Sequence, residues 1–271
     1  MRTLETGHGL HYLDIGQGEA VLLLHGLGSC GHDWEPQIQT LALHYRIIAP
    51  DLRGHGLSPA PHEGKPWRMA DLAQDVAELL AALELDSVHI VGFSLGGMVA
   101  LELAQMQRAT LPRIASLCLI NSLPLDAARP PSLVFTYWLR RTIIALFGLG
   151  AVGRLVAGKI FPRPDQERLR NSFITQMQQM SKSAYLAALD AIYHWHWRPR
   201  ADALSLPVLI LAADQDYTPV EAKRAFAAQL PDCRLEVIAD SRHGTPLDQA
   251  SKVNALLLSF LRQNITSTET R

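Results

Sequence analysis

Short apolar runs alternate with amphipathic helical patterns along most of this chain, and that alternation restricts the fold more than any other feature. The apolar runs, bounded by Gly, Pro or Asp, cover residues 11–15, 20–25, 46–49, 88–91, 115–120, 207–212 and 234–238. Most are typical of buried strands. Between them lie helical patterns such as residues 69–83, where leucine and valine recur every three to four positions and acidic residues, Asp75 among them, fall opposite. The alternation predicts an α/β fold with a mostly parallel central sheet flanked by helices.

The alternation stops between about residues 122 and 203, where helical patterns continue without a convincing strand. We interpret this stretch as a helical cap inserted into a core domain of residues 1–121 and 204–264, with a disordered tail at 265–271. The cap is rich in aromatic residues. Core packing is the usual role of any single one, but the cluster suggests a wall of the substrate pocket. The residues that we expect in that wall are Trp138, Phe147, Trp195 and Trp197.

Composition excludes several function classes. The 271 residues include 25 Lys and Arg against 26 Asp and Glu, so no basic surface for nucleic acid is expected. The apolar stretch at 143–152 is far shorter than the ~20 residues that a membrane-spanning helix needs, and fits a buried or lid helix. Three widely spaced cysteines without a CxxC pair argue against a disulfide framework and a zinc site. We therefore expect a cytoplasmic protein without a membrane span.

Residues 92–96, Gly-Phe-Ser-Leu-Gly, stand between a predicted strand and a predicted helix. A turn this sharp forces its central residue into a strained backbone conformation, and glycines two positions to either side let the strand and the helix pass closely. A serine before a helix is usually an N-cap. Here, however, the helix N-terminus would also favour the negative charge that develops during acyl transfer. The pattern predicts that Ser94 is a catalytic nucleophile.

A serine nucleophile needs a general base, most often a histidine that a carboxylate orients. His243 follows the last predicted strand and precedes the final helix, in a loop that suits a base. The strand at 207–212 leads into a loop with two competing aspartates, Asp214 and Asp216. We favour Asp216, which lies deeper in the loop and can bend back toward His243. The order Ser94, Asp216, His243 is the one expected for this motif.

Acyl transfer also needs donors for the oxyanion of the transition state. The backbone N–H of Leu95, directly after Ser94, is one predicted donor. Residues 25–29, His-Gly-Leu-Gly-Ser, follow a strand and form a flexible turn, and the N–H of Leu27 is the predicted second donor. A simple glycine turn is the alternative. We take His25 to be structural.

With these pieces in order, the chain resembles the α/β-hydrolase family from about residue 8 to residue 262. The resemblance rests on residues 25–28, 51–58 and 92–97, on the Asp216 loop, and on residues 243–246, His-Gly-Thr-Pro. It implies the α/β-hydrolase fold with a cap after the sixth strand, and Ser94, Asp216 and His243 as the catalytic triad. It also implies a structural role for residues 51–58, so that His55 is not the base.

Two departures from the family pattern concern the acid. The acid loop begins with Ala213 and Asp214 where many relatives have a glycine, and Asn121 stands at a strand end where some relatives place their acid. The asparagine favours Asp216 as the acid of this chain. Relatives that cleave carbon–halogen bonds or epoxides have aspartate in place of Ser94, so those two reactions are not expected.

We therefore expect a serine hydrolase of a small carboxylic ester or related acyl compound, with an apolar acyl or alcohol group and no cofactor or metal. A lactonase, a thioesterase, a cofactor-free perhydrolase or a carbon–carbon bond hydrolase would use the same triad. The last would need an arginine in the cap, and the candidates are Arg140, Arg141, Arg154 and Arg198. His194 and His196 have no carboxylate beside them and do not indicate a metal site. A ligand receptor is the non-enzymatic alternative, and the oligomeric state stays open.

Overall fold

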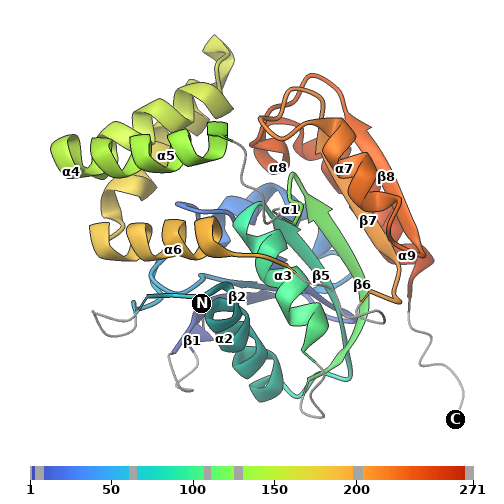
Figure 1. Ribbon diagram of the computed structural model, residues 1–271. Coiled ribbons are helices and arrows are strands. Elements are labelled where there is room, and N and C mark those ends of the chain that lie inside the picture. The colour runs from blue at the N-terminus through green and yellow to red at the C-terminus, as the bar shows by residue number, and fades with distance from the viewer. Residues whose placement is uncertain are drawn as a thin grey trace, which may run out of the picture.

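The structure is a computed structural model that describes residues 2–3, 9–60, 66–106, 111–124, 131–197 and 204–265. One sheet of eight strands runs through it in the order β1-β2-β4-β3-β5-β6-β7-β8 (Figure 1). The strands are β1 (Arg2–Thr3), β2 (His11–Ile15), β3 (Ala20–Leu24), β4 (Arg46–Pro50), β5 (Ser87–Phe93), β6 (Arg113–Ile120), β7 (Val208–Ala213) and β8 (Cys233–Ile238). β2 is antiparallel to β1 and β4, and the other pairs are parallel. The predicted α/β fold is confirmed, and the predicted strand ends differ by one or two positions.

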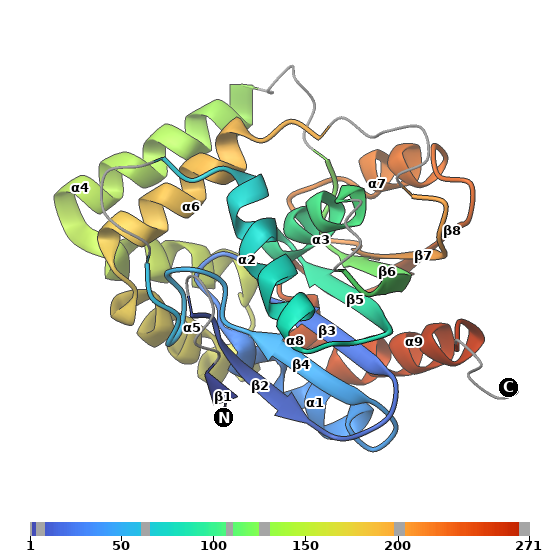
Figure 2. The same cartoon turned by 90° about the horizontal axis from the view of Figure 1, so that it is seen from below.

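Helices cover both faces of this sheet, which explains why its strands are continuous apolar runs. The helices of the core are η1 (Gly31–Trp34), α1 (Glu35–Leu41), α2 (Met69–Ala82), α3 (Leu95–Gln105), α7 (Val220–Ala227), α8 (Thr245–Asp248) and α9 (Ala250–Gln263). Figure 2 shows α2 and α3 on one face and α1 and α9 on the other. Successive side chains of a strand point to opposite faces. In β3, accordingly, Leu22 and Leu24 pack toward α2 and α3, whereas Val21 and Leu23 pack toward α1 and α9.

The segment predicted as the cap consists of helices in its described part, residues 131–197. They are α4 (Pro131–Ile160), η2 (Pro164–Gln166), α5 (Glu167–Gln179) and α6 (Lys182–His194). An apolar cluster that includes Ile144, Val152 and Tyr185 joins them, and they lie together at the upper left of Figure 1. Residues 198–203 and 266–271, which include Arg198 and nearly all of the predicted tail, lie outside the described residues. The domain boundaries stay a prediction.

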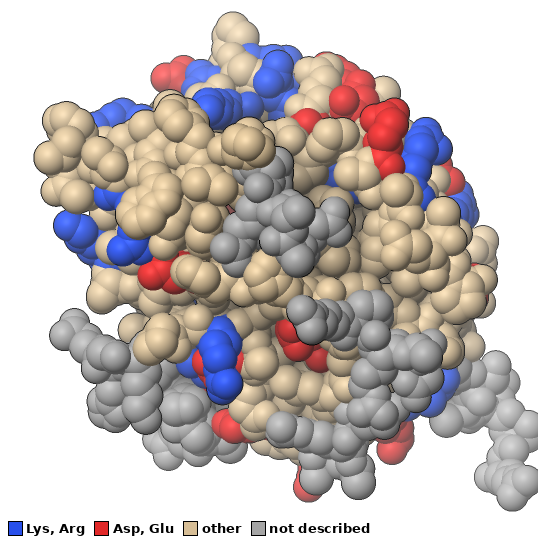
Figure 3. Space-filling view, viewed as in Figure 1, with Lys and Arg blue, Asp and Glu red and all other residues tan. Residues whose placement is uncertain are grey.

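α4 is longer than the apolar stretch at 143–152. By length and composition alone, its 30 residues would suffice to cross a membrane. However, Gly148 has φ 74° and ψ 178°, so the helix is broken there into two parts. Ile144 and Val152, on either side of the break, are buried in the cap. The exposed apolar side chains of α4 include Phe135 and Leu146, and the surface around α4 is mostly uncharged in Figure 3.

Residues 51–58 form a buried polar loop next to the carboxyl end of β4. Asp51 Oδ1 accepts the Gly31 N–H at 2.7 Å, and Asp51 Oδ2 accepts the Leu57 N–H at 2.9 Å and lies 3.1 Å from His11 Nδ1. In the same loop, Arg53 binds the Asp75 carboxylate of α2 through both of its oxygens, at 2.5 and 2.6 Å. The prediction that Asp75 lies on the exposed face of its helix is therefore wrong, because the guanidinium of Arg53 compensates the buried charge.

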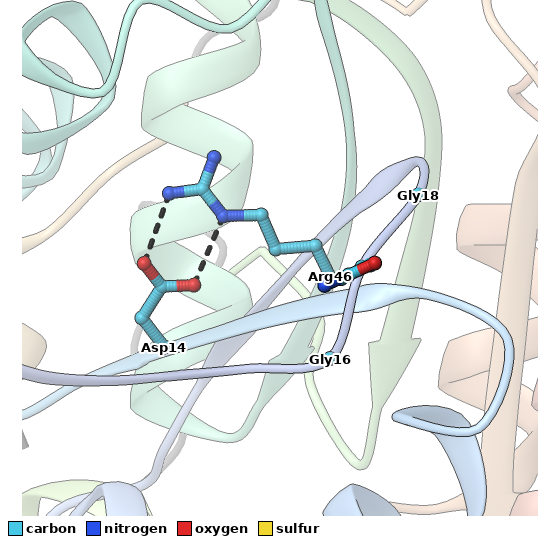
Figure 4. Close-up of a pocket in the computed structure, with 5 residues that line it drawn as sticks. Asp14, Gly16, Gly18 and Arg46 are labelled. Carbon is cyan, nitrogen blue, oxygen red and sulfur yellow. Dashed lines mark hydrogen bonds and ion pairs between the residues drawn. The ribbon is translucent and has the colours of Figure 1, made fainter.

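A shallow polar depression lies at the opposite end of the sheet, where β3 and β4 begin (Figure 4). It is lined by Asp14, Gly16, Gln17, Gly18 and Arg46. Arg46 Nε and Nη2 each donate to Asp14 at 2.9 Å. The two opposite charges neutralise each other, so this ion pair explains the polar lining of the depression as a structural feature.

We expect Asp51→Ala to lower the free energy of unfolding by about 3–5 kcal/mol, because each buried donor that loses its acceptor costs ~1–3 kcal/mol. Urea denaturation measures the change. The matched control is Glu236→Ala, which breaks the exposed pair with Arg234 and should cost less than ~1 kcal/mol. Equal losses in the two variants would contradict a structural role for Asp51.

Candidate active site

Ser94 lies at the sharp turn between β5 and α3. Its backbone has φ 53° and ψ −114°, a conformation that L-residues rarely adopt. Its N–H donates to Ile120 O of the neighbouring strand at 3.0 Å. Its carbonyl accepts the N–H of Gly97 at 3.0 Å and the hydroxyl of Ser122 at 2.8 Å. These bonds hold the strained turn in place.

The two glycines that flank Ser94 are required by close backbone contacts. A Cβ on Gly92 would lie 2.6 Å from Gly96 O, and a Cβ on Gly96 would overlap the carbonyl oxygen of Leu24 in β3. Real Cβ atoms do not approach backbone this closely. Only glycine therefore lets α3 pack this tightly against β3 and β5.

Side chains from three loops meet at Ser94, at the carboxyl ends of β5, β7 and β8. His243 Nε2 lies 2.9 Å from Ser94 Oγ, and His243 Nδ1 lies 2.8 Å from Asp216 Oδ1. Because an ionised carboxylate only accepts hydrogen bonds, Nδ1 carries the proton and Nε2 is the hydrogen-bond acceptor of the ring. The His243 ring is buried and lies against Phe93, with centroids 5.2 Å apart.

A buried lysine binds the other carboxylate oxygen of Asp216. Lys223 Nζ, from α7, lies 2.6 Å from Asp216 Oδ2, and both side chains are fully buried. The hydroxyl of Thr218 donates to the same oxygen. Burial alone would raise the pKa of Asp216, but the hydrogen bond and charge of His243, together with Lys223, hold it well below its ordinary value. Asp216 is therefore a stable anion beside His243.

Asp214 and Asn121 fix the loops around this site. Asp214 accepts the N–H groups of Asp240 and Ser241 at 3.1 Å each, so its carboxylate binds the backbone before His243 and not the imidazole. The Asn121 amide donates to His243 O at 2.9 Å, and its oxygen accepts the Ala213 N–H at 2.9 Å. Asn121, which stands where some relatives place the acid, connects the base loop to β7.

The turn with the second predicted oxyanion donor lies beside Ser94. A Cβ on Gly26 would lie 3.4 Å from Ser94 Cβ, and Gly26 O accepts the Ser29 N–H at 3.2 Å. Gly28 adopts φ 78° within this turn. Leu95 is the first residue of α3, where an N–H has no partner within the helix. The roles of Leu27 and Leu95 as oxyanion donors stay predictions.

Tyr217, directly after the acid, also reaches the site. Its hydroxyl oxygen lies 2.6 Å from His243 Nε2, and its ring lies against the imidazole with centroids 4.1 Å apart. The same nitrogen lies 2.9 Å from Ser94 Oγ. The pattern of the sequence did not single this residue out.

Two of the four aromatic residues predicted in the pocket wall pack against the core. Trp195 is buried and donates its indole N–H to Glu102, two turns beyond Ser94 in α3, at 2.5 Å. Trp197 packs edge-on against Phe226 of α7, with centroids 5.7 Å apart. Both pack with the core on the α2 and α3 side of the sheet. Their place in the pocket wall stays a prediction.

Trp138 and Phe147, the other two, lie on α4 with 58% and 71% of their surface exposed. Their place in the pocket wall stays a prediction.

The arginines of α4 differ in their surroundings. Arg141 binds Asp190 of α6 at 2.5 Å, and Arg154 is exposed. The charge of Arg140 opposes the rise in the pKa of the buried Tyr185 and of Tyr217. No ion pair of Arg140 is found in the described part of the chain. Arg140 is thus the cap arginine whose charge reaches the site.

The other buried histidines near the site have structural partners. His25 Nδ1 bonds to Gly26 O at 2.8 Å, and His25 Nε2 accepts the Leu52 N–H at 2.9 Å. Burial, with a contribution from the neighbouring His25, lowers the pKa of His55 to about 3. His194 Nδ1 bonds to Asp190 O at 2.9 Å. Among the described residues, no group of three or more His, Cys, Asp or Glu side chains could bind a metal ion.

A mostly parallel sheet with helices on both faces is the architecture of α/β enzymes. Residues 19–250 match the family described as alpha/beta hydrolase fold. The chain therefore belongs to the α/β-hydrolase family, and it is an enzyme.

Proteins similar over nearly the whole chain bear hydrolase and peroxidase names. The protein of Variovorax paradoxus named "Putative carbamate hydrolase RutD" is 31% identical over 263 residues, which cover 93% of this chain and 96% of that protein. A thermophilic esterase from Thermogutta terrifontis has a TM-score of 0.80 and 26% identity, covering 95% of this chain and 94% of that one. A bromoperoxidase from Bacillus anthracis has a TM-score of 0.84 and 25% identity, covering 94% and 95%.

We expect Lys223→Met to lower kcat/KM toward a nitrophenyl ester by about tenfold or more, since a hydrogen bond to a charged group is worth ~1.5–3 kcal/mol. Without the Lys223 cation, the negative charge of Asp216 attracts the imidazolium more strongly, so the acid limb of the pH profile should move to higher pH. Circular dichroism checks the fold of the variant. Lys252→Met, which changes an exposed lysine, is the matched control. An unchanged acid limb would contradict this role of Lys223.

Proposed function

We propose that the protein is a serine hydrolase that cleaves a small carboxylic ester or a related acyl compound, with Ser94, His243 and Asp216 as its catalytic triad. The observation that supports this proposal is the hydrogen-bonded chain from Asp216 Oδ1 through His243 to Ser94 Oγ, in steps of 2.8 and 2.9 Å. Both distances are within the range that proton transfer requires.

The chemistry follows from this order of groups. His243 Nε2 takes the proton of Ser94 as Oγ attacks the acyl carbon, and Asp216 stabilises the imidazolium that forms. The N–H groups of Leu27 and Leu95 bind the oxyanion, and a donor of this kind is worth about 3–4 kcal/mol. His243 then protonates the leaving group, and water attacks the acyl-enzyme with His243 again as the base.

The similar proteins support an acyl substrate. An esterase and a protein named as a carbamate hydrolase both act at an acyl carbon, the former by name at an ester. The proposed mechanism requires neither a metal nor an organic cofactor. An apolar substrate group and a cytoplasmic location are further expectations, the latter from three cysteines that are all free.

A fluorophosphonate probe should label the native protein and should fail to label Ser94→Ala and His243→Ala, because only an activated serine attacks such a probe. Gel fluorescence or intact-mass measurement detects the adduct. Ser251→Ala, which changes an exposed serine of α9, serves as the control that retains labelling. A native protein that takes up no label would favour the ligand receptor.

Arg140 favours a second candidate, a carbon–carbon bond hydrolase acting on a vinylogous diketone. Such a substrate carries negative charge after ionisation, and a guanidinium binds anionic oxygens in a planar, bidentate manner. Arg140 brings the required charge to the Tyr185 and Tyr217 side of the site.

The second candidate predicts that the native protein turns over a chromogenic diketone faster than any member of a short-chain nitrophenyl ester series. Arg140→Gln should then lower kcat/KM for the diketone by about 10–100-fold, the effect of losing a charge-assisted hydrogen bond. Arg154→Gln, on the same helix, should leave the rate unchanged. Turnover of esters alone would rule this candidate out.

A further inference from the structure

Tyr217 brings a phenol to the reacting atoms, and neither the triad nor the oxyanion donors account for it. Its hydroxyl lies 2.6 Å from His243 Nε2, the atom that also lies 2.9 Å from Ser94 Oγ. The ring planes of Tyr217 and His243 are tilted by 31° at a centroid distance of 4.1 Å. A second hydroxyl therefore contacts the same nitrogen of the proposed base as the proposed nucleophile does.

The two hydroxyls compete for a single lone pair. Because Nδ1–H of His243 is directed to Asp216, Nε2 of the neutral ring can accept one hydrogen bond. Ser94 Oγ lies 2.9 Å and the Tyr217 oxygen 2.6 Å from that atom. A phenol is the stronger acid and makes the shorter contact here, so Tyr217 is the favoured donor to Nε2 in the free enzyme.

During acyl transfer, the leaving-group oxygen must occupy the position that the Tyr217 hydroxyl holds in this structure. In the tetrahedral intermediate, the leaving-group oxygen is bonded to the same carbon as Ser94 Oγ. It must also lie within hydrogen-bonding reach of Nε2, which gives it a proton. The Tyr217 oxygen already lies within that reach of Nε2, at the same nitrogen that Ser94 Oγ contacts. In deacylation the attacking water needs the same place.

We propose that Tyr217 is a further catalytic residue that serves the leaving group: when substrate binds, its hydroxyl withdraws and donates a hydrogen bond to the leaving-group oxygen. The proton on His243 Nε2 passes to that oxygen as its bond to the acyl carbon breaks, and Tyr217 keeps its own proton. In deacylation the hydroxyl orients the water, while Nε2 accepts one of the water's protons. This inference rests on the proposed function, because it needs acyl transfer at Ser94.

The surroundings of Tyr217 suit this role. The residue lies in the loop between β7 and α7, and 65% of its surface is exposed, so the ring can shift without disturbing the core. The hydroxyl end, in contrast, is enclosed. That burial, followed by the charge of Asp216, raises the pKa of Tyr217. The phenol therefore stays protonated, as a hydrogen-bond donor must.

Tyr217→Phe tests the proposal with two esters of one carboxylic acid. An ethoxide leaving group needs protonation, whereas a nitrophenoxide leaves without it. We expect kcat/KM for the ethyl ester to fall by about 10–100-fold, as for the loss of one hydrogen bond to a charged group. The nitrophenyl ester and the rate of fluorophosphonate labelling should change by less than about threefold, because the geometry of Ser94 and His243 is kept.

Tyr45→Phe is the matched control, because it removes the same atom from a buried ring at the opposite end of the sheet. It should change the rate for neither ester. Equal losses for both esters, with slower labelling, would overturn the proposal and assign Tyr217 to the packing of His243. Equal gains would overturn it by showing that the hydroxyl only blocks Nε2. If the native protein cleaves neither ester, the proposed function fails and this inference fails with it. If the native protein is active and Tyr217→Phe changes both esters equally, only the role of Tyr217 is refuted.

Discussion

At Ser94 the backbone turns from β5 into α3 with a positive φ, and the other parts of the site are arranged around that turn. The strain persists because β6 accepts the Ser94 N–H, and because α3 packs against β3 and β5 through glycines without side chains. The turn directs Ser94 Oγ beyond the carboxyl ends of the strands. Loops from β7 and β8 end at the same edge, so His243 and Asp216 meet the serine there.

Buried polar contacts then determine how accurately those loops are held. Asp216 binds His243 through one oxygen and Lys223 through the other, so its carboxylate cannot rotate freely. Asn121 fixes the backbone of His243, and Asp214 fixes the residues before it. The buried carboxylate of Asp216 thus has a partner at each oxygen. A buried charge needs such partners if its burial is not to cost much stability.

Much of this could be predicted from the sequence because the signals are local. A buried strand followed by Gly-x-Ser-x-Gly, or by a loop with an aspartate, is visible within a dozen residues. Tyr217, Lys223 and Asn121 were not predicted as parts of the site, because each one acts through a partner that only the fold brings near. The burial of Asp75 was missed for the same reason, since Arg53 comes from another loop. The packing of Trp195 and Trp197 against the core was not foreseen, because the sequence pattern of a cap aromatic is the same whether it faces a ligand or α3.

In the proposed mechanism, the contact between the cap and the turn at residues 26–29 links specificity to rate. Met177 of α5 fills the space that a side chain at Gly28 would need, and the neighbouring Gln176 donates to Asp33 of η1 at 2.7 Å. The inner surface of the cap therefore rests on the same turn that carries the Leu27 N–H. A sequence change in α5 that suits a new substrate also shifts this turn. Exchanging caps between relatives would accordingly transfer catalytic efficiency along with selectivity, and the two properties would evolve together.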